Sequence, residues 1–419
     1  MKNIRINLKK IISFFSVVFF IFIFLNNHTI YSLSFENSGD IFLIVAILSL
    51  FVVILLTQKL YFNKKFYTII LFWFISVAIP CLLSGITRLS IVRCCYWFAL
   101  LIMIGCLYVA KIDYKKIFYI VCKIFCIWSL LCYFYTIFNL DFLPVTNVAT
   151  EKMYNWFTVN LYGYVISNPL SHFSFGNISF LRLDRPFGEP GIAQMYFNFG
   201  LIYSLFIEKN KKSKNIWSLI FILSVLLSFS TTGILILLTI VLIYIIMKKK
   251  YFILFPMFLI AATIACIMIY QKKGTVSYED RSGDIMFMLK TIFNNLPFGI
   301  GIGNTDLLEH NIIASTGTVS IGFYCGLLYP LAEYGILGIV YYIILFNSFK
   351  KFSENKYLRI AFSMFVIFTL FTEPDADECF IIAFLYSGLI EFCKLNNQNN
   401  RNLIKISENS GGNIWEMRY

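Results

Sequence analysis

Residues 215–248 read NIWSLIFILSVLLSFSTTGILILLTIVLIYIIMK, an apolar run long enough for two membrane-spanning helices. One spanning helix needs about 20 residues, because the helix rises 1.5 Å per residue across a hydrocarbon core of about 30 Å. The run is interrupted at 227–233, where LSFSTTG brings together hydroxyl side chains and a glycine. We therefore predict two consecutive spanning helices, over 215–230 and 232–248.

The same kind of run recurs along all 419 residues, of which 59% are apolar and 14% charged. The mean hydropathy of +0.76 excludes an ordinary soluble domain. Backbone groups in lipid must be paired internally, and the runs are too continuously apolar for a membrane β-barrel, so each is expected to be a helix. The predicted spans are 11–31, 41–57, 66–86, 91–110, 117–138, 190–207, 215–230, 232–248, 252–270, 328–349, 358–374 and 379–393. The prediction is one all-α, polytopic integral membrane helix bundle over 1–419, with about twelve transmembrane helices.

Basic residues indicate how the bundle lies in the membrane. With the N-terminus inside, most of the 35 lysines and arginines fall in inside segments, as the positive-inside rule requires. Both termini, including the tail 394–419, are then cytoplasmic, and the chain is expected in a bacterial cytoplasmic (inner) membrane. The net charge of +13 has the same explanation, so no nucleic-acid partner is predicted.

Two long extracytoplasmic (periplasmic or external) loops are predicted, 139–189 and 271–327. Long connections of this kind are uncommon unless they carry function. In the second loop, apolar side chains recur at helical spacing. They are Ile285, Met288, Leu289, Ile292, Phe293 and Leu296. This pattern predicts a helix that lies along the membrane surface or one that packs on the bundle, and the sequence does not separate the two.

The first loop ends with a charged cluster, LRLDRPFGEP at 181–190. Arg182 and Arg185 suit phosphate, because a guanidinium binds oxygens bidentately and stays protonated. The helix N-terminus that follows adds partial positive charge. Glu189 would contact a sugar hydroxyl or orient an arginine. The alternative is a structural Arg–Glu network that closes the loop.

The second loop carries Arg281, the segment PFGIG at 297–301, and His310 followed by Asn311. The glycines lack the spacing of a nucleotide-binding loop and permit close backbone approach instead. Beside Asp306 and Glu309, His310 is a candidate acid/base or sugar-binding group.

Arg88 and Arg93 flank the start of the fourth span on the outer side, against the charge trend. They would meet a phosphate from another side or snorkel to lipid headgroups. The acidic turn at 373–378 contains a DxD that a cation could use, but a solvated turn is the preferred interpretation, and no metal site is predicted. The eleven cysteines form no CxxC pair and are interpreted as small apolar residues.

Taken in order, these motifs resemble the O-antigen polymerase and ligase superfamily of bacterial envelopes. The matching segments are RPFGEP at 185–190, LSFSTTG at 227–233, Arg281 with PFGIG at 297–301, and His310-Asn311 with AEYGILG at 332–338. They cover roughly 180–345, whereas the first five spans match only in being hydrophobic. Many relatives have a basic residue where this chain has Thr231 and Thr232.

The resemblance implies a metal-independent membrane glycosyltransferase without a cofactor. Its substrate would be an undecaprenyl-diphosphate-linked oligosaccharide, polymerised into O-antigen or capsular polysaccharide on the outer face of the membrane. Arg185 and Arg281 would stabilise the leaving diphosphate, and Glu189 and His310 would activate or orient the acceptor hydroxyl. The substrate-binding set would be Arg182, Asp184, Arg88, Arg93, Asn311 and Glu333.

Besides the substrate and the bilayer, the expected partners are a chain-length regulator and a flippase of the same pathway. Two alternatives remain open at this point. One is the ligase of the same superfamily, and the other is a lipid-linked oligosaccharide flippase or other transporter. A transporter would place charges near mid-membrane, where this chain has only Lys123.

Overall fold

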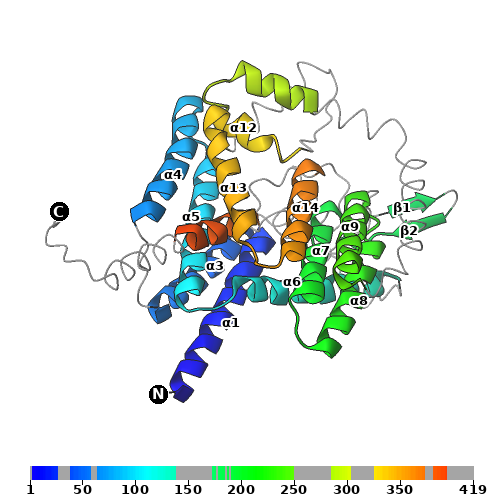
Figure 1. Cartoon of the computed structure of the whole chain (residues 1–419). Helices are drawn as coiled ribbons and strands as arrows, with labels where there is room; N and C mark the ends of the chain where they lie inside the picture. Colours follow the sequence, from blue (N-terminus) through cyan, green and yellow to red (C-terminus); the bar gives the residue numbers. More distant parts are fainter. Residues whose placement is uncertain are drawn as a thin grey trace, which may run out of the picture.

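The protein is seen here in a computed structural model, in which helices account for nearly all the regular structure (Figure 1). The structure describes residues 2–26, 38–57, 64–137, 172–175, 178–184, 186–187, 190–249, 285–302, 325–372 and 381–393. All structural statements below refer to these residues. The long apolar runs of the sequence are the source of this helical architecture, because each can bury or expose apolar surface while pairing its own backbone.

The elements follow one another with short connections wherever both neighbours are described. They are α1 (Lys2–Asn26), α3 (Ser38–Thr57), α4 (Lys64–Ser84), α5 (Arg88–Val109), α6 (Tyr114–Ile137), β1 (His172–Phe175), β2 (Ile178–Leu181), α7 (Pro190–Phe206), α8 (Lys211–Leu227), α9 (Thr231–Lys248), α12 (Tyr329–Tyr334), the 3-10 helix η4 (Gly335–Gly338), α13 (Ile339–Lys351) and α14 (Lys356–Thr372). Two further helices, Ile285–Asn294 and Ile381–Cys393, carry no label in the figures.

Six of the described helices are long and apolar enough to cross a membrane. They are Leu8–Asn26, Lys64–Ser84, Ser90–Val109, Tyr114–Phe134, Thr231–Lys248 and Tyr329–Lys351. The predicted all-α membrane class is therefore confirmed. The predicted number of about twelve spans stays a prediction. The predicted span 252–270 lies outside the described residues.

Helix α7 forms the centre of one half of the bundle, in contact with α6, α8, α9 and α14 (Figure 1). Almost every side chain from Pro190 to Ser204 is buried. Close approach to α8 depends on Gly200, because a Cβ there would lie 2.5 to 2.7 Å from atoms of the Phe221 ring. A small residue facing a large one lets the two helices interdigitate at the density of a protein core.

The interruption at 227–233 is a turn between α8 and α9, as the sequence predicts. Phe229 adopts a positive φ of 46°, which ends α8. Ser230 then caps α9, since its hydroxyl accepts a hydrogen bond from the Gly233 amide at 3.2 Å.

The predicted span 328–349 is not one continuous α-helix. It consists of α12, η4 and α13, and the irregular step begins at Gly335, where φ is +58°. The apolar pattern is unbroken across this step, so periodicity alone predicted a straight helix. The physical reason for the break is backbone contact with another segment, described below.

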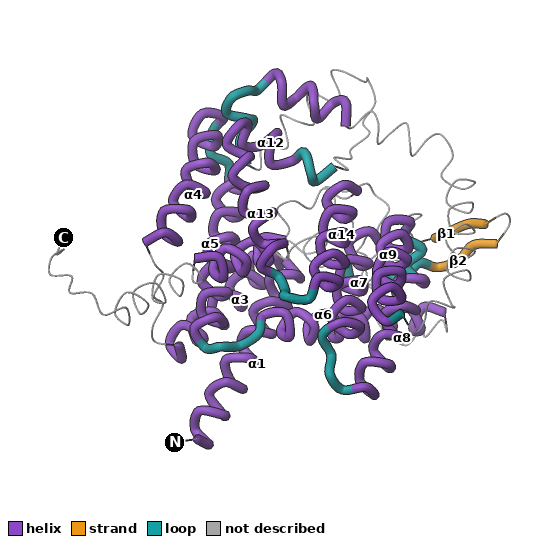
Figure 2. The backbone as a smooth tube through the Cα atoms, in the orientation of Figure 1, coloured by secondary structure: helices purple, strands orange, loops and turns teal. Residues whose placement is uncertain are grey.

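A short antiparallel hairpin, β1–β2, precedes the charged cluster of the first long loop (Figure 2). His172 pairs with Leu181, and Phe175 pairs with Ile178. The all-α prediction did not include these strands. They are the sole strands of the described residues and do not change the class.

Lysine amines rest on aromatic rings near the helix ends that the topology predicts to be cytoplasmic. Lys115 lies 4.5 Å from the ring centroid of Phe352, and Lys214 lies 4.8 Å from that of Tyr244. Aromatic faces attract cations, and their rings suit the boundary between apolar and wet surroundings.

Candidate functional site

The start of α5 is fixed by a reciprocal cap. The Thr87 hydroxyl accepts a hydrogen bond from the Ser90 amide at 3.1 Å, and the Thr87 amide donates to the Ser90 hydroxyl at 3.4 Å. Such a capping box satisfies two amides that the first helical turn leaves unpaired. The Ser90 hydroxyl also donates to the carbonyl of Ile302 at 2.6 Å, which ties the end of the PFGIG segment to α5.

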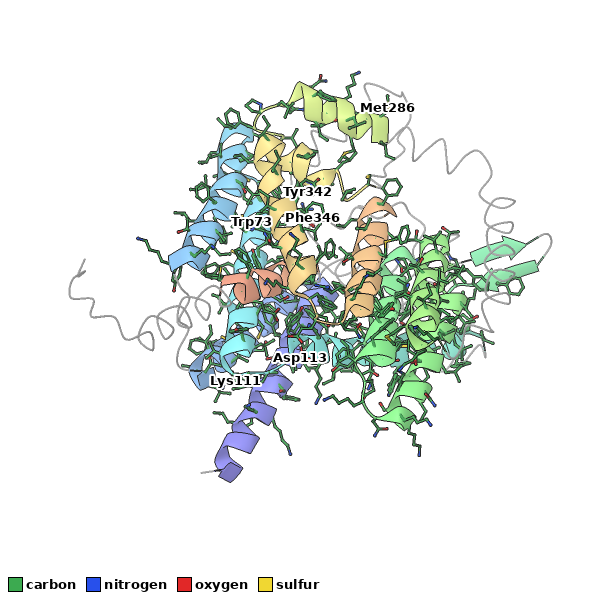
Figure 3. All side chains as sticks on the ribbon, viewed as in Figure 1. Trp73, Lys111, Asp113, Met286, Tyr342 and Phe346 are labelled. Atoms are coloured by element: carbon green, nitrogen blue, oxygen red, sulfur yellow. The ribbon has the colours of Figure 1, made fainter. Side chains whose placement is uncertain are left out.

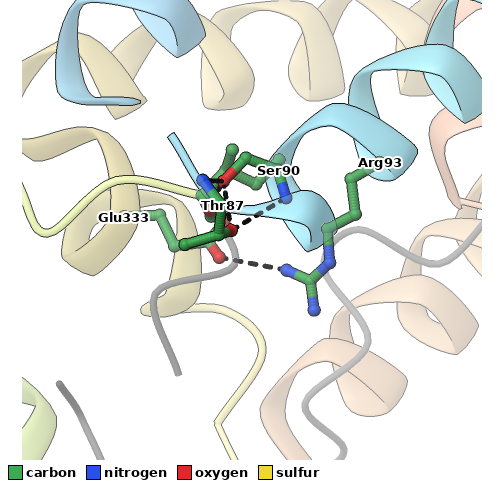
Figure 4. A network of polar contacts seen from close by, with 5 residues as sticks. Thr87, Ser90, Arg93 and Glu333 are labelled. Atoms are coloured by element: carbon green, nitrogen blue, oxygen red, sulfur yellow. Dashed lines mark hydrogen bonds and ion pairs between the residues drawn. The ribbon is translucent and has the colours of Figure 1, made fainter. Parts of the chain in front are cut away.

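One turn further along α5, Arg93 forms an ion pair with Glu333 of α12. Arg93 Nη1 donates to Glu333 Oε1 at 3.1 Å (Figure 4). The Glu333 side chain is only 2% exposed, whereas that of Arg93 is 20% exposed. The buried Glu333 carboxylate thus fixes the position of the Arg93 side chain, which remains partly exposed. A guanidinium oriented in this way can bind an anion.

The PFGIG segment runs beside the AEYGILG segment and pairs with it through the backbone. The amide of Ile300 donates to the Ala332 carbonyl at 3.0 Å, and that of Gly301 donates to the Glu333 carbonyl at 2.9 Å. The Ile336 amide returns a bond to the Pro297 carbonyl at 2.9 Å. These bonds take up backbone groups that a continuous helix would use, and they account for the break at η4.

Glycines make this pairing possible. Gly299 and Gly335 both adopt positive φ, +73° and +58°, where side chains are disfavoured. A Cβ on Gly299 would lie 2.5 Å from the Glu333 carbonyl oxygen, and one on Gly335 would lie 2.5 Å from the Pro297 carbonyl carbon. Two of the motifs that suggest the family resemblance therefore meet, and their glycine spacing serves close backbone approach.

A cluster of buried aromatic side chains adjoins Glu333, and two of them, Trp97 and Tyr334, line the same small internal space as this carboxylate. The rings of Trp97 and Tyr334 lie 6.2 Å apart, and that of Trp73 lies 5.5 Å from Trp97 and 6.0 Å from Tyr334. All three side chains are at most 2% exposed. These buried rings exclude water, and the lower local dielectric constant strengthens the attraction between Arg93 and Glu333.

The charged cluster of the first loop meets the turn between α8 and α9. The Leu183 amide donates to the Leu227 carbonyl at 2.9 Å. Arg182 donates from Nε to the Ser228 carbonyl at 3.1 Å and from Nη2 to the Phe229 carbonyl at 3.2 Å. These carbonyls belong to the C-cap of α8 and to the residue after it, where the helix no longer supplies amide donors. Arg182 thus holds this turn, and a direct contact with substrate stays a prediction.

Asp184 is buried, with 1% of its surface exposed, and its carbonyl accepts the Phe187 amide at 3.0 Å. The Phe187 ring stacks on Tyr196 of α7, with ring centroids 4.4 Å apart. The loop before α7 is therefore anchored to the bundle at this point. Substrate binding by Asp184 and the alternative Arg–Glu network both stay predictions.

The structure also reveals two buried amides that the sequence analysis passed over. Asn198 donates to Gln194 Oε1 at 2.8 Å and to the Gly233 carbonyl at 3.3 Å. Gln194 Nε2 and Asn198 Oδ1 have no hydrogen-bond partner among the described residues. Their i, i+4 spacing in an otherwise apolar span was the available signal, because polar groups at that spacing share a helix face.

Several predicted site residues lie outside the described residues. They are Arg185, Glu189, Arg281, His310 and Asn311. Arg88 begins α5, and its side chain is likewise outside the description. Of the ten predicted site residues, the structure brings Arg93 and Glu333 into direct contact.

A cleft of about 420 Å³ lies at the end of the bundle opposite the 285–294 helix (Figure 3). Its polar lining includes Lys111, Asp113, Ser387 and Glu391. Asp113 also accepts the Lys115 amide at 3.0 Å and so caps α6. None of the described site residues lines this cleft, and it takes no part in the function proposed below.

Comparison of the chain with protein-family models, with curated proteins and with solved structures finds no match.

Proposed function

We propose that this protein joins undecaprenyl-diphosphate-linked oligosaccharide repeat units into a polysaccharide at the outer face of the cytoplasmic membrane. The observation that carries the proposal is the Arg93–Glu333 pair at the junction of two glycine-rich segments. It supplies an oriented, partly exposed guanidinium at the end of a membrane helix. That is the group needed to hold a phosphate whose lipid tail stays in the bilayer.

Contacts between the sequence motifs also support the proposed polymerase. PFGIG pairs with AEYGILG through backbone hydrogen bonds, and Arg182, just before RPFGEP, bonds the α8–α9 turn formed by LSFSTTG. Two segments that resemble the superfamily thus meet directly. Chance patterning of apolar residues gives no reason for this pair to meet.

The proposed reaction is a glycosyl transfer. The hydroxyl oxygen of the incoming repeat unit forms a bond to the anomeric carbon of the growing chain, and the bond from that carbon to the diphosphate oxygen breaks. The hydroxyl proton passes to a base, for which Glu189 and His310 are the candidates. The diphosphate leaves with the electron pair and is stabilised by Arg185 and Arg281, with Arg93 binding a phosphate of either substrate.

The surroundings of Lys123 favour an enzyme over a transporter. Its amine lies 4.0 Å from the ring centroid of Tyr119 and 4.7 Å from that of Trp217. The cation is thus accommodated by aromatic faces, which gives it a structural role without a transported ion.

The test uses purified protein in liposomes, supplied only with the lipid-linked repeat unit of its host, with glycan length read on a gel. We expect a ladder of lengths that disappears in Arg93→Ala and Arg185→Ala. Loss of a positioned electrostatic group typically costs about 10²–10³ in rate. Arg185→Lys should be nearly as inactive as Arg185→Ala, because lysine lacks the bidentate fork.

Folding of each variant is checked by thermal unfolding before activity is compared. No ladder from folded wild-type protein would contradict the polymerase. Transfer that begins only when a second glycan acceptor is added would indicate the ligase alternative instead.

A further inference from the structure

The helix Ile285–Asn294 is apolar but too short to cross a membrane. Its ten residues span about 15 Å, half of the hydrocarbon thickness of a bilayer. In Figure 1 it is the yellow-green helix at the end of the bundle opposite the N-terminus, and it runs across the direction of α4 and α13. Met286, labelled in Figure 3, marks its place.

The two faces of this helix differ in what they contact. Met288 and Ile292 are 0% and 8% exposed and pack on the hydrophobic core of the bundle. Met286 and Phe293, which share another face, are 68% and 70% exposed. Lys290 lies between these two in sequence and is also exposed. Packing on the bundle therefore accounts for one apolar face and leaves a second one uncovered.

The uncovered face continues beyond the helix. Leu296 and Phe298, in the turn that follows, are 41% and 43% exposed. The chain then passes the last turn of α4, where a Cβ on Gly301 would overlap the Ser84 hydroxyl and lie 3.2 Å from the Pro80 carbonyl oxygen. The segment after the helix is thus at the level where α4 ends.

The end of α4 is itself apolar and exposed. Leu82 and Leu83 are 69% and 63% exposed, on a helix long and apolar enough to cross a membrane, and Ile86, just after that helix, is 59% exposed. Lipid covers such a surface on a spanning helix. The exposed side chains of the 285–294 helix therefore adjoin a lipid-facing surface.

We propose that the 285–294 helix lies in the plane of the membrane at the boundary between headgroups and acyl chains, with Met286 and Phe293 inserted into lipid. The leaflet is the one in which α4 ends. A helix with aromatic and aliphatic residues beside a lysine binds this boundary, because the apolar side chains leave water while the amine reaches the headgroups.

This placement bears on the Arg93–Glu333 pair, and that consequence rests on the proposed function. The Gly301 amide is bonded to the Glu333 carbonyl, and Ser90 is bonded to Ile302. The segment that follows the helix is thus part of the wall of the site. An anchored helix would hold this site at the depth of the phosphate layer, so the substrate it fits is a membrane-borne amphiphile with an anionic headgroup.

The experiment measures depth, which requires no activity. Single cysteines replace Met286, Phe293 and Lys290 in the full-length protein, are labelled with a fluorophore, and are placed in liposomes. Quenching is compared between lipids carrying a nitroxide near the headgroup, lipids carrying one deep in the acyl chain, and an aqueous quencher. Phe72→Cys, on the exposed side of α4, calibrates deep lipid, and Lys211→Cys calibrates water. The unmodified protein, taken through the same labelling, gives the background from native cysteines such as the exposed Cys95.

We expect labels at 286 and 293 to be quenched at least threefold more by the shallow lipid nitroxide than by the aqueous quencher, with the label at 290 closer to water. Labels at 286 and 293 that behave like the one at 211 overturn the proposal. Labels that neither lipid nor water quenches also overturn it, because protein then covers the face. A correct depth with no glycan ladder would leave the anchored helix standing and reject the polymerase.

Discussion

Arg93 Nη1 and Glu333 Oε1 lie 3.1 Å apart, although 240 positions separate the two residues in the chain. The pair joins the second turn of α5 to α12, with Glu333 buried and Arg93 one-fifth exposed. Removing one member of a buried pair leaves the other charge without compensation, whereas removing both is often close to neutral.

Arg93→Met is therefore expected to lower the free energy of unfolding by about 3 kcal/mol. Arg93→Met combined with Glu333→Met should recover most of that loss in thermal unfolding, because no uncompensated charge remains. Glycan synthesis should stay absent in the double variant if the guanidinium binds substrate. Recovery of both stability and synthesis would show that the pair is purely structural.

The sequence was sufficient to predict helices at most of the described positions, because apolar runs of spanning length have few other solutions in lipid. It could not predict that Arg93 meets Glu333, since each was recognised separately and their contact depends on how the fold places α12 relative to α5. The break at Gly335 likewise could not be predicted, because AEYGILG lies in a largely apolar run and the partner that breaks the helix, Pro297, lies in a distant loop.

The sequence analysis missed buried polar residues that carry no charge. Gln194 and Asn198 are fully buried in α7 and hydrogen-bonded to each other. The predicted site residues were instead mostly arginines, carboxylates and a histidine. A buried amide is costly unless paired, so an i, i+4 amide pair in a spanning run indicates a packed polar contact.

Gly335 and Gly85 provide a matched test of close backbone approach. Both adopt positive φ, +58° and +98°, but a Cβ on Gly85 would meet nothing within 4 Å, whereas one on Gly335 would press on the Pro297 carbonyl. Gly85→Ala should cost about 1–2 kcal/mol from backbone strain alone. Gly335→Ala should cost clearly more, because a backbone carbonyl cannot rotate away. Equal unfolding midpoints for the two variants would argue against the pairing of PFGIG with AEYGILG.

The α7–α8 contact predicts coupling between Gly200 and Phe221. Gly200→Ala places a Cβ 2.5 Å from the Phe221 ring, and overpacking of this kind costs about 1–3 kcal/mol. Phe221→Leu alone should also destabilise, since it removes volume from a fully buried position. Together they should destabilise less than the sum of the two, because the smaller side chain makes room for the methyl group. Strictly additive losses in denaturant unfolding would show that the helices are not in contact here.

Lys123→Met separates a structural lysine from a transport residue. The amine lies over the rings of Tyr119 and Trp217, and loss of such cation–π contacts costs about 1–2 kcal/mol. We expect a lower unfolding midpoint, a similar decrease in Trp217→Leu, and an unchanged glycan ladder in both. Methionine keeps the length of the side chain and its apolar contacts, so the comparison isolates the charge. If Lys123→Met abolished activity while Trp217→Leu did not, the charge itself would be required within the membrane. The transporter alternative would then be favoured over the polymerase.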